Sequence, residues 1–247
     1  MSEAAVIMAA GKGTRMNSDL PKVLHLAAGK PLVHWVVEAC RTAGLQDIVV
    51  VVGYKEHLVR ASLAEQGVRF VTQHEQKGTG HAAAQAAPAL VGLEGRVFVL
   101  NGDCPLITAP VIEAMRAAHV AAAADATLLY VAPEQPLEYG RLIRKDNGEV
   151  VDVIEERDCT AEQKRIRELN AGFYVFNAPA VWTALASLSN SNQAGEYYIT
   201  DVARFYGRDG KVVAVKAPDE MALGVNTPEQ LRQVEATLLG RGLARSN

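Results

Sequence analysis

The sequence is poor in three features that mark particular protein classes: paired cysteines, net charge and long apolar runs. Its three cysteines, Cys40, Cys104 and Cys159, are odd in number and widely spaced, so they predict neither a disulfide framework nor a zinc site. The net charge of −3 gives no basic field for nucleic acid, and no segment is long and apolar enough to span a bilayer. Because the N-terminus also lacks a signal-peptide pattern, we expect a reduced, cytoplasmic protein without a nucleic-acid or membrane partner.

The first half of the sequence contains a regular alternation of short apolar runs and helical patterns. β-branched runs such as Asp47–Val52 are typical of parallel strands that are buried on both faces. Segments with apolar residues at helical spacing lie between these runs, and repeated strand–helix units imply right-handed crossovers. The pattern therefore predicts an α/β fold with a doubly wound, mostly parallel sheet. The predicted strands are 4–8, 47–52, 68–72 and 96–100, and the predicted helices are 31–43, 54–66, 78–90 and 109–119.

The second half changes character, because a hairpin and a polar segment interrupt the alternation. Asn147-Gly148, between the runs 142–144 and 150–155, is a strong hairpin signal. The hairpin and a polar helix predicted at 160–168 indicate a small lobe beside the main sheet, which could form the second wall of a cleft. No linker divides the chain, so we expect one structural unit with two lobes. Further strands are predicted at 126–131, 171–176 and 212–215, and further helices at 178–188, 197–206 and 227–239.

A glycine loop follows the first predicted strand. Gly11 and Gly13 lie next to Lys12 and Arg15 in this loop, and Lys22 follows a few residues later. Glycine lets a ligand approach the main chain closely, and successive N–H groups in such a turn can hold anionic oxygens. The loop is neither a dinucleotide fingerprint, which needs a third glycine, nor a P-loop, which needs Gly-Lys-Ser/Thr. It predicts a site for a phosphate-rich substrate, although Gly-x-Gly after a strand is often a plain loop.

Polar residues follow two other predicted strands, where the ligands of open α/β sheets are bound. Gln73 follows the third strand, and its carboxamide can donate and accept together, as the edge of a nucleotide base requires. Asp103 follows the fourth strand. A carboxylate beside a phosphate site is a natural ligand for Mg²⁺, although Gly-Asp is also common in turns. Cys104 is interpreted as a small buried residue rather than a nucleophile.

Three strings resemble those of the sugar-1-phosphate nucleotidyltransferase family: Gly11–Arg15 followed by Pro21-Lys22, then Gln73–His81 and Gly195–Asp201. Within that family the sequence is most similar to the pyrophosphorylase (uridylyltransferase) domain of bacterial N-acetylglucosamine-1-phosphate uridylyltransferases. Bacterial members usually continue into a left-handed β-helix acetyltransferase domain. This sequence shows no hexapeptide repeat, so acetyl transfer is not expected here. The resemblance implies a nucleotidyltransferase domain at 1–240, mainly nucleotide-binding at 1–125 and mainly sugar-phosphate-binding at 126–226, with a C-terminal tail at 241–247.

The resemblance implies an activity and a set of site residues. The reaction would transfer UMP from UTP to N-acetylglucosamine 1-phosphate with Mg²⁺ as cofactor, giving UDP-N-acetylglucosamine, a cell-wall precursor, and pyrophosphate. Arg15 and Lys22 would be catalytic, and Asp103 and Asn226 would bind the metal. The implied nucleotide-binding residues are Met8, Ala9, Ala10, Gly11, Gly13, Lys22, Gln73, Gly78, Thr79, Asn101 and Gly102. The implied sugar-phosphate residues are Gly140, Glu155, Asn170, Glu196 and Thr200.

Alternatives to this activity stay open at the level of sequence. Another sugar 1-phosphate, such as glucose or N-acetylmuramic acid, or another nucleoside triphosphate would use the same loop. A non-catalytic nucleotide-binding or regulatory subunit belongs to a different class. The joint presence of Arg15, Lys22, Asp103 and Asn226 argues against that class, because a binding module need not retain a metal pair. Asn226 also has a plain structural interpretation as a residue at a helix cap.

Overall fold

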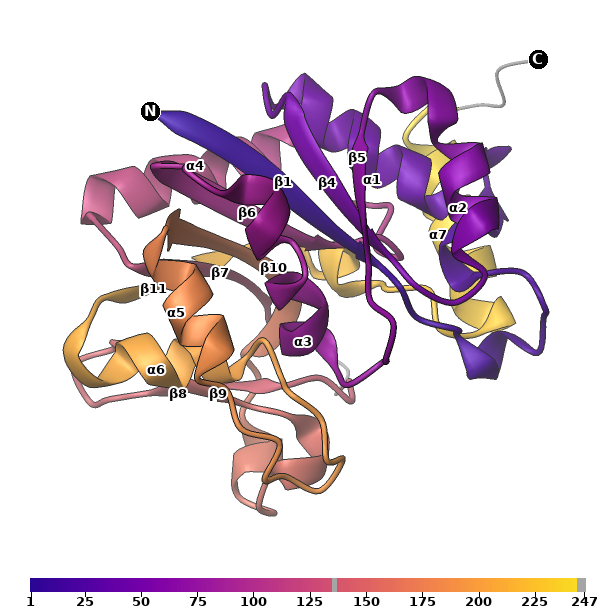
Figure 1. Ribbon diagram of the computed structural model, residues 1–247. Helices are drawn as coiled ribbons and strands as arrows, with labels where there is room; N and C mark the ends of the chain where they lie inside the picture. The colour runs from indigo at the N-terminus through magenta and orange to yellow at the C-terminus, as the bar shows by residue number, and fades with distance from the viewer. Residues whose placement is uncertain (135–136, 244–247) are drawn as a thin grey trace.

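The computed structural model of the chain describes residues 1–134 and 137–243, so residues 244–247 of the predicted tail lie outside the described part. A central sheet runs through the molecule with helices on both faces (Figure 1). The strand order is β11-β7-β10-β6-β1-β4-β5, with β8 and β9 attached through β10. The strands are β1 Ser2–Ala9, β4 Asp47–Val52, β5 Arg69–Thr72, β6 Gly95–Asn101, β7 Ala126–Val131, β8 Arg141–Arg144, β9 Val150–Ile154, β10 Leu169–Ala178 and β11 Val212–Lys216, and a separate hairpin joins β2 Leu26–Ala27 to β3 Lys30–Pro31.

Strand β1 shows why the sheet needs helices on both faces. Ala5 and Ile7 belong to one hydrophobic cluster and Ala4 and Val6 to another, because successive side chains of a strand point to opposite faces. The pairs β1/β4, β1/β6, β4/β5 and β7/β11 are parallel, so the predicted doubly wound, mostly parallel α/β sheet is confirmed. Helices α1 Leu32–Thr42, α2 Glu56–Ser62 and α4 Ala109–Ala122 cover the first face, and α3 Thr79–Ala84, α5 Ala180–Ala186 and α6 Asp201–Asp209 cover the second.

Strand β10 breaks the parallel pattern. It lies between β6 and β7 and runs antiparallel to both. Its register with β7 shifts between Asn170 and Tyr174, where Gly172 adopts a φ of 79° that favours glycine. Such a bulge bends the strand and re-aims the side chains beside it. The amino end of β10 therefore turns toward the hairpin β8–β9, while its other end stays in the central sheet.

The last helix, α7 (Pro228–Gly240), closes the fold beside the glycine loop. Val234 and Leu238 of α7 pack with Met16 and Leu32 in a third, smaller hydrophobic cluster. Thr227 caps the helix: its side chain accepts a hydrogen bond from the Gln230 backbone, and Gln230 reciprocates. This packing brings residues of the C-terminal segment next to the N-terminal loop. No helix within residues 1–134 and 137–243 combines the length and hydropathy needed to cross a membrane.

Two predicted helices differ from the structure. The helix predicted at 160–168 is wrong: only a 3₁₀ turn, Gln163–Arg165, forms there. Its sequence carries a turn signal, since Thr160 and Gln163 exchange side-chain hydrogen bonds, but it has no apolar stripe to bury. The helix predicted at 197–206 begins only at Asp201, because the backbone of Tyr197 pairs with Lys77 and Gly80 instead. The segments 54–66 and 78–90 each contain a short α-helix followed by a 3₁₀ turn.

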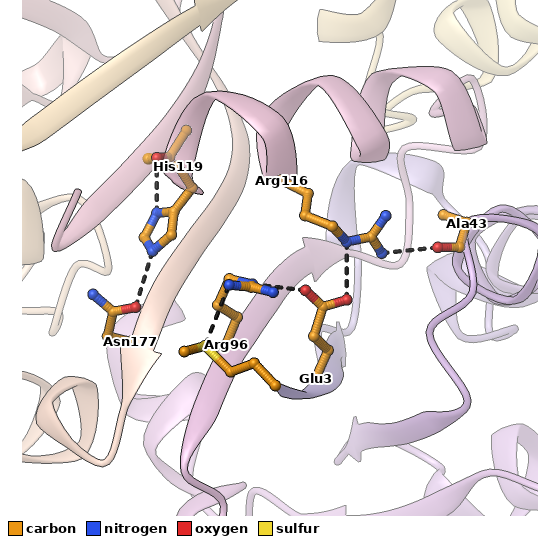
Figure 2. A network of polar contacts seen from close by, with 8 residues as sticks. Glu3, Ala43, Arg96, Arg116, His119 and Asn177 are labelled. Atoms are coloured by element: carbon orange, nitrogen blue, oxygen red, sulfur yellow. Dashed lines mark hydrogen bonds and ion pairs between the residues drawn. The ribbon is translucent and has the colours of Figure 1, made fainter. Parts of the chain in front are cut away.

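A polar network lies at the amino end of the sheet (Figure 2). Glu3 accepts from Arg96 Nε at 2.7 Å and from Arg116 Nε at 2.9 Å, and Arg116 also donates to the carbonyl of Ala43 at 2.8 Å. Beside it, the buried His119 ring contacts Thr127 Oγ1 at 2.9 Å and Asn177 Oδ1 at 3.0 Å. Burial lowers the pKa of His119, so the neutral ring donates from Nε2 to the Asn177 oxygen and accepts at Nδ1. At this end of the sheet the polar groups satisfy one another.

Candidate active site

A cavity of about 490 Å³ opens at the carboxyl end of the sheet, where the predicted functional residues gather. The ends of β1 and β6 and the loops after β1, β5 and β6 form one side, and the β8–β9 lobe with the start of β10 forms the other. All but three of the predicted residues line it. The predicted residues in the lining are Met8, Ala9, Ala10, Gly11, Arg15, Lys22, Gln73, Gly78, Thr79, Asn101, Asp103, Gly140, Glu155, Asn170, Glu196 and Asn226.

The glycine loop leaves β1 and turns across the mouth of this cavity. Gly13 adopts a φ of 69°, and a Cβ there would lie 2.6 Å from Lys22 Cβ, so glycine is required both for the turn and for the close approach of the two segments. A 3₁₀ turn, Thr14–Met16, follows, and buried Met16 anchors it in the third cluster. Arg15 is exposed at the cavity and makes no hydrogen bond or ion pair with any residue in the described ranges. Its guanidinium is therefore available to an anionic ligand.

Lys22 lies between two oxygen-bearing side chains. Its Nζ forms an ion pair with Asp103 Oδ2 and donates to Asn226 Oδ1 at 2.9 Å. Lys22 and Asp103 are nearly buried, with side-chain exposures of 15% and 16%. The Val225 backbone N–H donates to the Asp103 carbonyl at 2.9 Å, which joins the segment before α7 to the end of β6. Asp103 and Asn226, which are 123 positions apart in the sequence, thus both direct a side-chain oxygen to the Lys22 ammonium.

This pair of oxygens fits the chemistry of a magnesium site. Mg²⁺ takes oxygen ligands and is commonly held by one or two protein carboxylates together with substrate phosphates. Asp103 supplies a carboxylate, Asn226 supplies an amide oxygen, and both already converge on a cation. In the described part of the chain, no three His, Cys, Asp or Glu side chains cluster as a complete metal cage. The donor set thus fits a metal that takes its other ligands from substrate and water.

Cys104 lies beside this pair but is not a candidate nucleophile. Its Sγ donates weakly to Asp103 Oδ1 at 3.6 Å. Burial, together with the Asp103 charge, raises the pKa of the Cys104 thiol well above its ordinary value, so the thiolate is disfavoured. This agrees with its interpretation as a small buried residue.

Gln73 presents one polar atom to the cavity. Its Nε2 donates to the Gly78 carbonyl at 3.2 Å and contacts His81 Nδ1 at 3.0 Å. No donor within the described ranges reaches its Oε1, and the residue lines the cavity. Since both amide hydrogens are engaged internally, Gln73 offers an acceptor rather than a donor to a ligand. A base with an N–H on its pairing edge matches this arrangement.

The turn at Gly78 is held by a segment from the other half of the chain. Gly78 has a φ of 108°, and a Cβ there would lie 2.6 Å from the Tyr197 carbonyl oxygen. Gly80 N–H donates to that carbonyl at 2.8 Å, and Ile199 N–H donates to Thr79 Oγ1 at 3.1 Å. The extended segment 196–199 therefore fixes the loop that follows Gln73. This use of its backbone is why 197–200 is not helical.

Glu155 dominates the lobe side of the cavity. It follows β9 and accepts from the Thr200 hydroxyl at 3.0 Å through Oε1. Burial is the main cause that raises the pKa of Glu155. A Cβ on Gly140 would lie 3.5 Å from Glu155 Oε2, an ordinary contact distance, so the glycine lies directly beside that carboxylate. The arrangement gives a hydrogen-bond acceptor suited to a hydroxyl or amide group of a ligand.

Asn170 uses its amide to order the bulge of β10. Its Nδ2 donates to the Tyr174 hydroxyl at 2.7 Å, and its Oδ1 accepts from Gly172 N–H at 3.2 Å. A Cβ on Gly172 would clash with Asn101 Nδ2, so only glycine allows this close packing of β10 against the end of β6. Both asparagines line the cavity at the point where its two sides meet.

Three predicted residues do not line the cavity. Gly13 supports Lys22, the Gly102 N–H donates to the Met8 carbonyl at 3.0 Å, and Thr200 lies behind Glu155. A direct contact of these three residues with substrate stays a prediction. The cavity also contains residues that the sequence did not indicate as site residues, among them Gln76 and Tyr174. Of these, Gln76 had a usable signal, because it lies in the loop after a parallel strand, between Gln73 and Gly78.

Comparisons with known proteins agree with this geometry. The family model described as the MobA-like NTP transferase domain matches residues 5–195. Proteins named bifunctional protein GlmU are 42% identical in Clostridium tetani (98% of this chain, 53% of the relative), 44% in Pelotomaculum thermopropionicum (98% and 53%) and 45% in Geobacter metallireducens (93% and 49%). The chain thus spans about half the length of the curated relatives it matches.

A solved structure shares the fold. The crystal structure of a UDP-glucose pyrophosphorylase complexed with UDP-glucose superposes with a TM-score of 0.81 at 19% identity, over 98% of this chain and 100% of that chain. At that identity the likeness concerns the fold alone. The family match covers more than half of the chain, and the predicted resemblance to nucleotidyltransferases is confirmed. The chain belongs to the MobA-like NTP transferase domain family.

Proposed function

We propose that this chain catalyses the Mg²⁺-dependent transfer of UMP from UTP to N-acetylglucosamine 1-phosphate, which yields UDP-N-acetylglucosamine and pyrophosphate. The observation that carries the proposal is the composition of the 490 Å³ cavity. One side of that cavity holds cationic side chains and a pair of metal-type oxygens, and the other holds hydrogen-bonding groups suited to a sugar. Neither a plain anion site nor a plain sugar site would need both.

The chemical step needs alignment more than a base. An oxygen of the sugar phosphate attacks the α-phosphorus of UTP, a new P–O bond forms, and the bond to the bridging oxygen of the β-phosphate breaks with its electron pair leaving on pyrophosphate. Phosphate oxygen is already a nucleophile at neutral pH. Arg15 and Lys22 would bind and neutralise phosphate oxygens during this exchange. Mg²⁺, held by Asp103 and Asn226, would neutralise charge on both phosphates as a Lewis acid.

The remaining residues would select the substrates. The Gln73 acceptor and the backbone of the Gly78 turn would bind the uracil edge. Glu155, Asn170 and the Gly140 backbone would bind sugar hydroxyl and N-acetyl groups. We also propose a reducing, cytoplasmic location, and the free state of all three cysteines supports it.

The test is a pyrophosphate-release assay with Mg²⁺ on the purified chain. UTP, CTP, GTP and ATP are each combined with N-acetylglucosamine 1-phosphate, glucose 1-phosphate and N-acetylmuramic acid 1-phosphate. The expected result is turnover with UTP and N-acetylglucosamine 1-phosphate at least tenfold above every other pair. Preference for another pair would mean that the nucleotide or sugar phosphate has been assigned wrongly. Binding of nucleotide without turnover by any pair would favour a non-catalytic nucleotide-binding subunit.

A further inference from the structure

The most informative contact in the cavity is that of Lys22. The proposed function assigns this side chain to substrate phosphate, yet it contacts Asp103 and Asn226, the two residues proposed to bind the metal. Its Nζ pairs with Asp103 and donates to Asn226 Oδ1. The same two oxygens are the candidate donors to Mg²⁺ in the proposed function, on which this inference rests. An ammonium group and a metal ion cannot occupy the point between these oxygens together.

The stem of Lys22 is fixed while its end is free to move. Gly13 lies against Cβ, Cγ and Cδ of Lys22, and Lys22 begins a 3₁₀ turn after Pro21. Beyond Cδ, the ammonium can rotate away from Asp103 without any change in the backbone. Lysine is suited to this exchange because it is a point charge on a flexible chain, whereas arginine prefers a fixed fork geometry.

The charges around Asp103 oppose metal binding before substrate arrives. Lys22 and Arg15 both line the cavity, and Asp103 is the carboxylate in contact with Lys22. A divalent cation must therefore displace one positive charge and approach another. A triphosphate reverses this balance, because it offers Lys22 and Arg15 new partners and supplies oxygens to the metal.

We propose that Lys22 occupies the metal position in the substrate-free protein and that a divalent cation gains Asp103 and Asn226 only when nucleotide phosphates draw the lysine away. Nucleotide and metal then bind cooperatively, since each removes an obstacle to the other. The free protein holds metal weakly, and the complete site forms only around substrate.

The test measures binding of Mn²⁺, an oxygen-preferring stand-in for Mg²⁺, to the nucleotide-free chain by the EPR signal of unbound Mn²⁺. Lys22→Met removes the ammonium but keeps the length of the side chain. It is expected to bind Mn²⁺ at least about tenfold more tightly than the wild-type chain, because it leaves Asp103 and Asn226 without a cation. Lys22→Arg, which keeps a cation at the position, is expected to show no gain.

Two further variants distinguish displacement of the Lys22 ammonium by Mn²⁺ from a general effect of positive charge on Mn²⁺ affinity. Arg15→Met removes one positive charge from the same cavity without freeing either oxygen, and a change below about threefold is expected. Lys22→Met with Asp103→Asn is expected to lose the gain. Equal gains in Lys22→Met and Arg15→Met would overturn the proposal, and so would an absence of any gain in Lys22→Met. Thermal melts of each variant establish that it is folded.

The outcome is distinguishable from failure of the proposed function. The Mn²⁺ titration contains no nucleotide and no sugar phosphate, whereas the proposed function is tested by pyrophosphate release. Turnover by the wild-type chain together with equal Mn²⁺ binding by Lys22→Met would overturn only the role of Lys22. A tenfold gain in Lys22→Met without turnover by any substrate pair would leave the exchange at Asp103 intact and reject the proposed reaction.

Discussion

At the amino end of the sheet, one carboxylate, Glu3, accepts hydrogen bonds from two arginines, and each polar group shown there has a partner (Figure 2). At the carboxyl end, one lysine serves two oxygens, while Arg15 contacts no polar group of residues 1–134 or 137–243. The first arrangement is complete without a ligand. The second leaves the positive charge of Arg15 and the side-chain oxygen of Gln73 without a partner among the described residues.

This difference indicates that the polar groups at the amino end of the sheet stabilise the fold, whereas some of those at the carboxyl end remain available to bind a ligand. A satisfied, nearly buried ion network holds strands and helices together, and removal of one partner leaves the others without compensation. A site for substrate must keep some of its groups unsatisfied until substrate arrives. The same substitution, carboxylate to amide, should therefore have opposite consequences at the two ends.

The largest expected effect is that of Asp103→Asn on activity. Loss of the carboxylate removes the charged metal ligand, so turnover in the pyrophosphate-release assay should fall by at least about 10²–10³-fold. The melting temperature should fall less than in Glu3→Gln, because Asp103 serves one cation rather than two and Lys22 keeps its hydrogen bond to Asn226 Oδ1. Retained turnover in this variant would reject the assignment of Asp103.

The next effect is that of Arg15→Met. Since Arg15 has no hydrogen-bond or ion-pair partner within residues 1–134 and 137–243, its loss should lower kcat/KM for UTP by about 10²-fold while the thermal melt stays unchanged. Steady-state kinetics with varied UTP measures the first quantity and a thermal melt the second. A lowered melting temperature would show that Arg15 serves the fold, contrary to the contrast between the two ends.

Glu3→Gln should lower stability and leave activity nearly unchanged, the opposite of what is expected for Asp103→Asn and Arg15→Met. The change leaves Arg96 and Arg116 without a counter-charge and should lower the free energy of unfolding by about 1–3 kcal/mol. For a chain of this size, that lowers the melting temperature by about 2–4 °C for each kcal/mol. Calorimetry measures the shift, and kcat should stay within about twofold of the wild-type value. A large loss of kcat would remove the distinction between the ends.

The smallest expected effect is on stability in Glu155→Gln, and it depends on pH. Burial raises the pKa of Glu155 in the folded chain, so its stabilising contribution is full below the ordinary glutamate pKa of about 4.3 and is lost as pH rises through the raised value. The glutamine variant should therefore melt at a higher temperature than the wild-type chain near pH 8, and this advantage should vanish toward pH 4.

Glu155→Gln also tests the proposed binding of the sugar phosphate by the lobe side of the cavity. The KM for N-acetylglucosamine 1-phosphate should rise about tenfold, because a charged acceptor is replaced by a neutral one. Melting curves from pH 4 to pH 8 and kinetics with varied sugar phosphate provide the two readings. A stability difference that does not change with pH would mean that Glu155 ionises without cost in the folded chain.

The parallel part of the fold formed by β1, β4, β5 and β6 could be predicted from sequence, because a helix follows each of these strands before the next strand of the central sheet or, for β6, before β7. The place of β10 could not be predicted. Its run from Leu169 to Ala178 is mainly apolar apart from Asn170 and Asn177, as a buried parallel strand also is, and nothing local specifies an antiparallel partner. The polar segment 160–168 misled the prediction, because a cap signal alone does not make a helix without a face to bury.

The site was predicted in part for the same reason. Residues after parallel strands, such as Gln73 and Asp103, meet at one end of the sheet by construction. Asn226 follows no sheet strand directly, so only the family resemblance indicated it. The contact between Lys22 and Asn226 joins residues 204 positions apart, and no local pattern encodes it. The backbone pairing of Tyr197 was equally invisible, because main-chain groups carry no sequence signal.

The separation of Asn226 from Asp103 by 123 residues has a consequence for synthesis. The glycine loop, Lys22 and Asp103 leave the ribosome first, and Asn226 follows only after more than a hundred further residues. A nascent chain can therefore fold its first strands and pair Lys22 with Asp103 long before the second oxygen arrives. The cap at Thr227 then holds the segment that carries Asn226, so the pair of oxygens on Lys22 is complete only when both halves of the described fold have been synthesised.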